Sequence, residues 1–357
     1  MSTSTALNRR AFLARALAIG ASLPLAAACR GTAGAGTSAA GSAATSAPVR
    51  AGGKTITARV SHVLQSTEPN HLALERVADN VGKRTDNQLQ LKVFPNAQLG
   101  AEIEAAESVS TGAIEMAVVS PGALGTFLPQ FGAFSAPYLW KDWDQARKVF
   151  DGPLAKSLDE QLIAKKGMHV LDYWDFGWRH AFTRNKPIMS IDDLKGLKIR
   201  VSKNKMFIET FKAFGSAATP MDWTEVYQGL QQGVVDGAEA PLPSIQSSKL
   251  NEVAKQVGLT YHMLQANITI ANDKWYRSLP DDLRKVFDEE MRSGGDYMMQ
   301  LTKQQEDAAQ GDLKAKGMTF TEPNLDGFRE AARQVPRAFE ADWGPDFWDK
   351  LQEAKGS

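Results

Sequence analysis

The chain has 357 residues, of which 43% are hydrophobic, so it can bury more than one core and we expect two domains. Lys and Arg together number 41, as do Asp and Glu, so no basic surplus is present to bind nucleic acid. The single cysteine excludes a disulfide within the chain.

The N-terminal segment has the layout of an export signal. Arg9 and Arg10 form a twin-arginine pair, a stretch rich in alanine and leucine follows, and small residues end at Ala28. The apolar stretch is too short to span a bilayer and contains Arg15. We therefore predict an export signal of the twin-arginine type over residues 1–28, with an ordinary amphipathic helix as the alternative.

A lone cysteine and a low-complexity segment follow this signal. Cys29 stands directly after the small residues, and residues 31–53 are nearly all Gly, Ala, Ser and Thr. Such a composition cannot bury a core and behaves as a flexible tether. We predict lipidation of Cys29 and a tether over residues 29–53. The protein would then be held by its lipid alone in the periplasm, at the outer face of the cytoplasmic membrane.

Strand and helix patterns alternate after the tether. We expect strands at 55–63, 88–94 and 114–119, with a helix that opens at Pro69 and another over 102–109 between them. This order implies a parallel sheet with helices on both faces. In such sheets ligands bind beyond the carboxyl ends of the strands.

A second α/β unit and a long helix come next. Strands are expected at 168–174, 197–201 and 234–239, and a helical pattern runs over 280–316, interrupted by Gly294-Gly295. A helix of that length would span roughly 50 Å, more than one small domain needs. We expect it to run along both domains.

Several motifs, in one order along the chain, resemble the solute receptors of TRAP transporters, the DctP-like family. The resemblance extends from residue 55 to the C-terminus. Its motifs are Phe94-Pro95-Asn96-Ala97-Gln98-Leu99-Gly100, Gly112-Ala113-Ile114-Glu115-Met116, Gly177-Trp178-Arg179, Asp192-Asp193-Leu194-Lys195-Gly196-Leu197-Lys198-Ile199-Arg200-Val201, Thr219-Pro220-Met221 and Gly233-Val234-Val235-Asp236-Gly237-Ala238-Glu239.

The resemblance implies an α/β fold of the two-domain periplasmic-binding-protein type, with hinge strands and a long C-terminal helix that spans both domains. The first domain would comprise 54–176 with 266–305, and the second 177–265 with 306–357. The family's receptors close on a small organic acid and deliver it to the small and large membrane subunits of an ion-gradient-driven importer. We expect this chain to do the same as a monomer.

Arg200 is the first candidate for binding the acid. Ile199 and Val201 share one face of the expected strand, which leaves Arg200 on the other face at the carboxyl end. A planar guanidinium can hold a carboxylate through two parallel hydrogen bonds. An exposed or salt-bridged arginine is the alternative from the residues alone, and the resemblance implies the carboxylate clamp.

Arg179 follows Gly177-Trp178, where the chain should cross between the domains. The resemblance implies a second arginine of the binding pocket at this position. A structural ion pair between the domains is the alternative.

Trp223 lies in the first turn of an expected helix, where Asp222 and Glu225 form an acidic capping box. The resemblance implies an aromatic wall for the ligand, and core packing is the alternative. Glu239 ends an expected strand where the resemblance implies the edge of the pocket, and Ala240 stands where many relatives have asparagine. Ile103 stands where sialic-acid receptors tend to have arginine, so it and Ala240 both count against sialic acid.

Three further candidates are Ser120, Gln65 and Trp174, each at or just after the end of an expected strand. Unspecialised loop positions are the alternative. The tryptophans at 174, 178 and 223 suggest a partly apolar or aromatic ligand, although tryptophan also packs protein interiors.

An enzyme is the main alternative from another class. The five histidines form no His-Glu-x-x-His motif, and the sequence has no Gly-x-Ser-x-Gly motif and no phosphate-binding loop. We therefore expect no catalysis, cofactor or metal. A receptor for a sensor or for another type of importer remains the third possibility, because fold alone does not decide function.

Overall fold

The structure is a computed structural model that describes residues 55–356. The export signal, the tether and Cys29 lie outside the described residues. Within 55–356, no helix combines the length and the apolar character of a membrane span.

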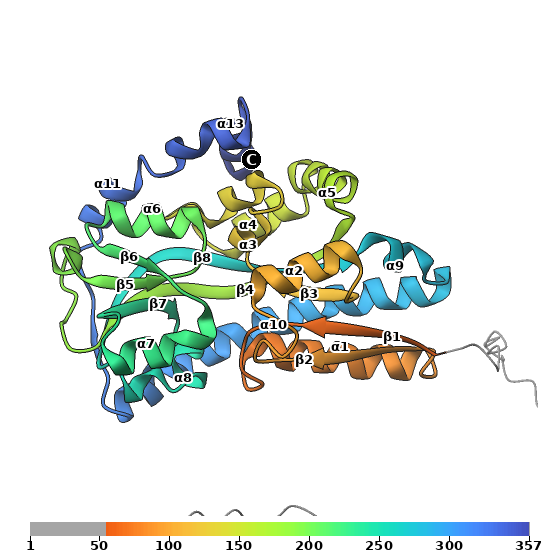
Figure 1. Ribbon diagram of the computed structural model, residues 1–357, viewed down its shortest axis with the longest axis horizontal. Helices are drawn as coiled ribbons and strands as arrows, with labels where there is room; N and C mark the ends of the chain where they lie inside the picture. Colours follow the sequence, from red (N-terminus) through yellow and green to blue (C-terminus); the bar gives the residue numbers. More distant parts are fainter. Residues whose placement is uncertain (1–54, 357) are drawn as a thin grey trace, which may run out of the picture. The chain divides into compact units, whose positions relative to one another are not determined.

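One mixed sheet of nine strands runs through the described chain, in the order β2-β1-β3-β8-β4-β7-β5-β6, with β9 beside β8 (Figure 1). The strands are β1 Ile56–Ser61, β2 Leu89–Phe94, β3 Met116–Val119, β4 Met168–Thr183, β5 Lys198–Val201, β6 Ala217–Pro220, β7 Gly237–Pro241, β8 Gln256–Asn272 and β9 Thr319–Thr321.

The sheet has two parallel groups joined by two long strands. In the first group β1 pairs in parallel with β2 and β3, and in the second β5 pairs in parallel with β6 and β7. Between them β4 and β8 run antiparallel to each other, and β3 and β7 join them antiparallel. The parallel arrangement expected for the first three strands is confirmed. The strand expected at 168–174 is part of β4, which pairs antiparallel with β7 and β8, so the sheet as a whole is mixed.

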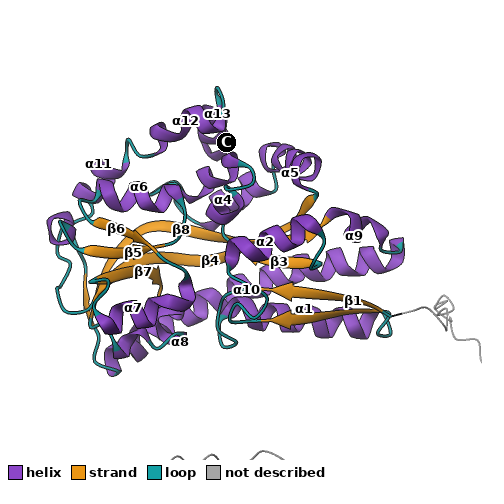
Figure 2. Ribbon diagram, viewed as in Figure 1, coloured by secondary structure: helices purple, strands orange, loops and turns teal. Residues whose placement is uncertain are grey.

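Helices cover both faces of this sheet (Figure 2). The α-helices are α1 Pro69–Arg84, α2 Glu102–Thr111, α3 Pro121–Leu124, α4 Trp143–Phe150, α5 Pro153–Lys166, α6 Lys205–Ala213, α7 Val226–Gln232, α8 Leu242–Ser247, α9 Asp273–Ser278, α10 Asp281–Ala315, α11 Asp326–Ala332, α12 Glu340–Trp343 and α13 Phe347–Gly356. Short 3-10 helices are η1 Pro129–Ser135, η2 Ile191–Leu194, η3 Trp223–Glu225, η4 Leu250–Glu252 and η5 Pro336–Phe339.

The long helix α10 is continuous through its 35 residues, so the two glycines do not interrupt it. It packs against α1 beside the first parallel group, against β4, and against α8 beside the second group. The glycines allow this close approach. A Cβ atom at Gly294 would lie 3.0 Å from the Trp174 ring and collide with Val77, and one at Gly295 would lie 2.7 Å from Asp172 Oδ2.

The variant Gly294→Ala is expected to destabilise the fold by about 1–3 kcal/mol, because the added methyl group overpacks the contact with Val77 and Trp174. Gly311→Ala, on the same helix, is the matched control. Its Cβ would meet no atom within 4 Å, so helix propensity should stabilise it by up to about 1 kcal/mol. Urea unfolding measures both, and equal effects at the two glycines would contradict the close packing.

Candidate functional site

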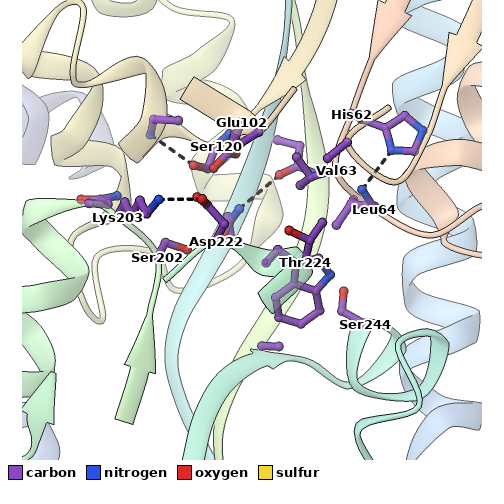
Figure 3. A pocket seen from close by; sticks show the side chains of 18 of the residues that line it. His62, Val63, Leu64, Glu102, Ser120, Ser202, Lys203, Asp222, Thr224 and Ser244 are labelled. Atoms are coloured by element: carbon purple, nitrogen blue, oxygen red, sulfur yellow. Dashed lines mark hydrogen bonds and ion pairs between the residues drawn. The ribbon is translucent and has the colours of Figure 1, made fainter. Parts of the chain in front are cut away.

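A cleft opens where the carboxyl ends of strands from both parallel groups meet β4 and β8 (Figure 3). Its empty space is about 900 Å³, including the part open to solvent. Its polar lining residues are His62, Glu102, Ser120, Arg179, Arg200, Ser202, Lys203, Asn204, Asp222, Thr224, Ser244, Gln265 and Asn267, and its larger apolar ones are Val63, Leu64, Ile103, Phe176, Met221 and Trp223.

Arg200 presents an incompletely bonded cation to this cleft. The side chain extends from β5 and is only 2% exposed. Its Nε and Nη2 atoms donate to the carbonyl oxygen of Met221, at 3.0 and 2.7 Å, but Nη1 has no hydrogen-bond partner in the described structure. Burial lowers the pKa of Arg200 to about 10, so the group stays charged at neutral pH. A buried charged donor without a partner is costly, and an anion in the cleft would relieve that cost.

Trp223 forms part of the wall beside this guanidinium. The centre of the guanidinium group of Arg200 lies 5.4 Å from the centroid of the Trp223 ring. The turn that carries the ring is fixed by Glu225, whose side chain accepts a hydrogen bond from the backbone N–H of Asp222 at 3.0 Å. Trp223 therefore lines the cleft, whereas Val226 and Leu230, which follow it in α7, are buried.

Arg179 also lines the cleft, but its charge is matched inside the protein. Its Nε and Nη2 atoms bond the two carboxylate oxygens of Glu239 at 2.5 and 2.8 Å, and Nη1 donates to Gln265 at 2.8 Å. Burial alone would raise the pKa of Glu239, but the Arg179 charge and a hydrogen bond from His262 hold that pKa below its usual value. Arg179 and Glu239 thus form a buried ion pair, with Arg179 in the cleft wall and Glu239 behind it.

A chain of amides continues from this pair through two residues of β8 to Asn70 of α1. Gln265 Nε2 donates to Asn267 Oδ1 at 3.1 Å, and Asn267 Nδ2 donates to Asn70 Oδ1 at 3.1 Å. Asn70 Nδ2 lacks a partner in the part of the chain that the structure describes. The amides give the cleft floor a fixed set of donors and acceptors.

Glu102 brings a carboxylate to the opposite wall, at the start of α2. Its Oε1 atom accepts the backbone N–H of Ser120 at 2.5 Å, and the two residues lie together in Figure 3. Burial raises the pKa of Glu102, an effect opposed by this hydrogen bond and by the charges of Arg200 and Arg179. On the rim, Lys203 pairs with Asp222 at 2.6 Å (Figure 3).

The structure brings most of the candidates together. Arg200, Arg179, Trp223, Ala240 and Ser120 all line the cleft, and so does Ile103. No group of three acidic, histidine or cysteine side chains within 55–356 is arranged to hold a metal ion.

Three candidates are placed elsewhere. Glu239 is fully buried and reaches the cleft only through Arg179. Trp174 is fully buried because α10 passes over it at the two glycines. Gln65 follows Leu64, a lining residue, but is outside the lining, and its backbone carbonyl accepts the N–H of Glu68.

Several lining residues were not singled out from the sequence as binding residues. Gln265 and Asn267 stand two apart in the otherwise apolar strand β8, and this alternation is a readable signal for one polar face. Asn204 follows the strand of Arg200 and caps α6 through Met206 N–H, at 2.8 Å. Glu102 stands in the first turn of α2, a common position for an acid, and only the fold brings it into the cleft lining with Arg200.

Comparison with known proteins gives one consistent family. The model of a family described as bacterial extracellular solute-binding protein, family 7, matches residues 60–342. The chain is 31% identical, over 275 residues, to the sialic acid-binding periplasmic protein SiaP of Vibrio cholerae. That match covers 77% of this chain and 85% of SiaP.

Solved structures agree with this match. The sugar acid binding protein DctPAm of Advenella mimigardefordensis, in complex with galactonate, has a TM-score of 0.81 at 28% identity, covering 85% of this chain and 99% of that one. A TRAP periplasmic solute binding protein of Polaromonas, bound to D-erythronate, has a TM-score of 0.79 at 30% identity, covering 84% and 98%. The expected fold class, with its long C-terminal helix, is confirmed.

Proposed function

Because the chain belongs to family 7 of the bacterial extracellular solute-binding proteins, we propose that it is the receptor of a TRAP transporter and binds a small organic acid. The observation that carries this proposal is the unpartnered Nη1 atom of the buried Arg200 in the cleft wall. The acids in the two related structures, galactonate and D-erythronate, support an anionic ligand. The chain acts as a receptor rather than an enzyme and delivers its ligand to the small and large membrane subunits.

Binding works by closure of two domains on the acid. The first domain comprises 54–176 with 266–305, and the second 177–265 with 306–357. Glu102 and Ser120 then belong to the first domain and Arg200 to the second, so a ligand in the cleft contacts both and favours the closed state. Closure also removes water, which strengthens the pairing of the carboxylate with Arg200.

A buried contact beside the cleft joins the two proposed domains. Glu68 precedes α1 in the first proposed domain, and its carboxylate accepts the hydroxyl groups of Ser244 and Ser247 at 2.7 and 2.8 Å. Both serines belong to α8 in the second proposed domain. Opening the cleft would break these hydrogen bonds. It would also expose to water the carboxylate of Glu68, which is fully buried here, and hydration of that group would offset part of the loss.

A thermal-shift screen of the purified protein against a library of organic acids tests the receptor function. A ligand at 100 times its dissociation constant should stabilise the protein by about 2.7 kcal/mol. The neutral amides of the same acids serve as matched controls and should give no shift. Equal shifts from acids and amides, or no shift from any acid, would contradict the proposal.

The family's location is periplasmic, and the N-terminal sequence supports a more specific proposal. The twin-arginine signal directs export, and lipidation of Cys29 anchors the receptor at the outer face of the cytoplasmic membrane. Mass spectrometry of the native N-terminus tests this. A diacylglyceryl-modified Cys29 is expected, and an unmodified N-terminus would contradict the anchor.

A further inference from the structure

Two of the cations that line the cleft form ion pairs with acids of the protein, whereas one cation and one carboxylate of the lining form none among the described residues. Arg179 is neutralised by Glu239, and Lys203 by Asp222 at 2.6 Å. Arg200 bonds only a carbonyl oxygen, and Glu102 forms no ion pair within the described residues. Among the described residues, the cleft therefore holds one cation and one carboxylate that form no ion pair, on walls that line the same space.

Arg200 and Glu102 require different chemical groups from a ligand. Nη1 of Arg200 lacks an acceptor, which a carboxylate supplies. Glu102 is an acceptor that already takes one backbone N–H from Ser120, so the groups that complete it are O–H or N–H donors. A second carboxylate of the guest near Glu102 would place two like charges in a partly desolvated cleft, which is unfavourable.

The remaining lining fits hydroxyl groups rather than a second anion. The other two cations of the described cleft wall are held in their own ion pairs, so neither is free for another carboxylate. In the lining, the amide nitrogen of Asn204 has no hydrogen-bond partner among the described residues, and neither has that of Asn70, which lies outside the lining at the end of the amide chain. Hydroxyl groups both donate and accept, so they can satisfy Glu102 and such amides together.

We propose that Glu102 is a specificity-determining residue and that the ligand is a hydroxylated monocarboxylate: its carboxylate pairs with Arg200 and its hydroxyl groups donate to Glu102. Glu102 disfavours dicarboxylates of the same length. This inference rests on the proposed receptor function and names the class of acid that the receptor takes.

Matched pairs of acids test the inference by titration calorimetry on the purified protein. D-Galactonate and galactarate differ only at the terminal carbon, a CH₂OH group in the first and a carboxylate in the second. D-Erythronate and meso-tartrate form the corresponding four-carbon pair. The wild-type protein is expected to prefer the monocarboxylate of the pair that it binds by about tenfold or more, which corresponds to one lost charge-assisted hydrogen bond.

The variant Glu102→Gln keeps the shape of the side chain and removes its charge. It should reduce the preference to within about threefold, because the amide no longer repels the second carboxylate. A preference that stays at its wild-type value in this variant would overturn the role of Glu102. If the variant does not fold, the preference of the wild-type protein alone still decides the ligand class.

Failure of the inference differs from failure of the receptor function. Dicarboxylates that bind the wild-type protein as tightly as the matched monocarboxylates would overturn the inference and leave the receptor function intact. If no organic acid binds at all, both are overturned.

Discussion

Replacing Arg200 with alanine is expected to weaken binding of the acid by about 2–5 kcal/mol, roughly 30-fold to several thousand-fold. The reason is that the ligand carboxylate would lose its cationic partner in a site shielded from water. Titration calorimetry with an acid found in the screen measures the change. Arg200→Lys keeps the charge but lacks the planar fork, so it should recover only part of the affinity.

Removing the charge of Arg200 should not destabilise the protein in the absence of ligand. Arg200 is buried without an acidic partner, so Arg200→Met removes an uncompensated charge and should leave the free energy of unfolding unchanged or raise it. This outcome separates a binding role from a structural one. Affinity within about threefold of wild type in either the alanine or the methionine variant would contradict the account.

Breaking the ion pair between Arg179 and Glu239, in contrast, should destabilise the fold. Glu239→Gln leaves the Arg179 charge buried without a counter-charge, so the fold should lose about 3–5 kcal/mol of stability in urea unfolding. Asp222→Asn is the control, because its pair with Lys203 is partly exposed and screened by solvent, and should cost less than about 1 kcal/mol. Similar costs for the two variants would contradict the structural importance of the buried pair.

The contribution of Glu239 to the stability of the fold should depend on pH. The pKa of Glu239 is lowered in the folded protein, so the unfolded chain takes up its proton first as the pH falls. The contribution of Glu239 to stability is therefore fully present above its unfolded pKa, near 4.5, and is lost as the pH falls through the lower folded value. The difference in stability between wild type and Glu239→Gln should accordingly shrink in acid.

The sequence allowed the local elements to be predicted well, because their signals are local. Pro69 marks the start of α1, and the alternation over 88–94 and 197–201 corresponds to β2 and β5. The length of β4 and the whole of β8 were not predicted from periodicity. These strands are buried on both faces over much of their length, and such runs carry no alternation that distinguishes a strand.

The cleft could be predicted in part. Arg200, Arg179 and Trp223 were found because the motifs around them resemble the family. Whether each guanidinium is free or paired depends on contacts between segments distant in the chain, such as Arg179 with Glu239 and Gln265. The interruption expected at Gly294-Gly295 was wrong for the same reason, since the glycines serve contacts with Trp174 on β4.

A crystal structure of the protein with a bound organic acid tests most directly whether Arg200 is the carboxylate receptor. We expect one carboxylate oxygen at about 2.7–3.0 Å from Nη1 of Arg200, with Trp223 against the same end of the ligand. A ligand whose carboxylate pairs with Lys203 on the rim, while Nη1 of Arg200 still lacks an acidic partner, would contradict the account.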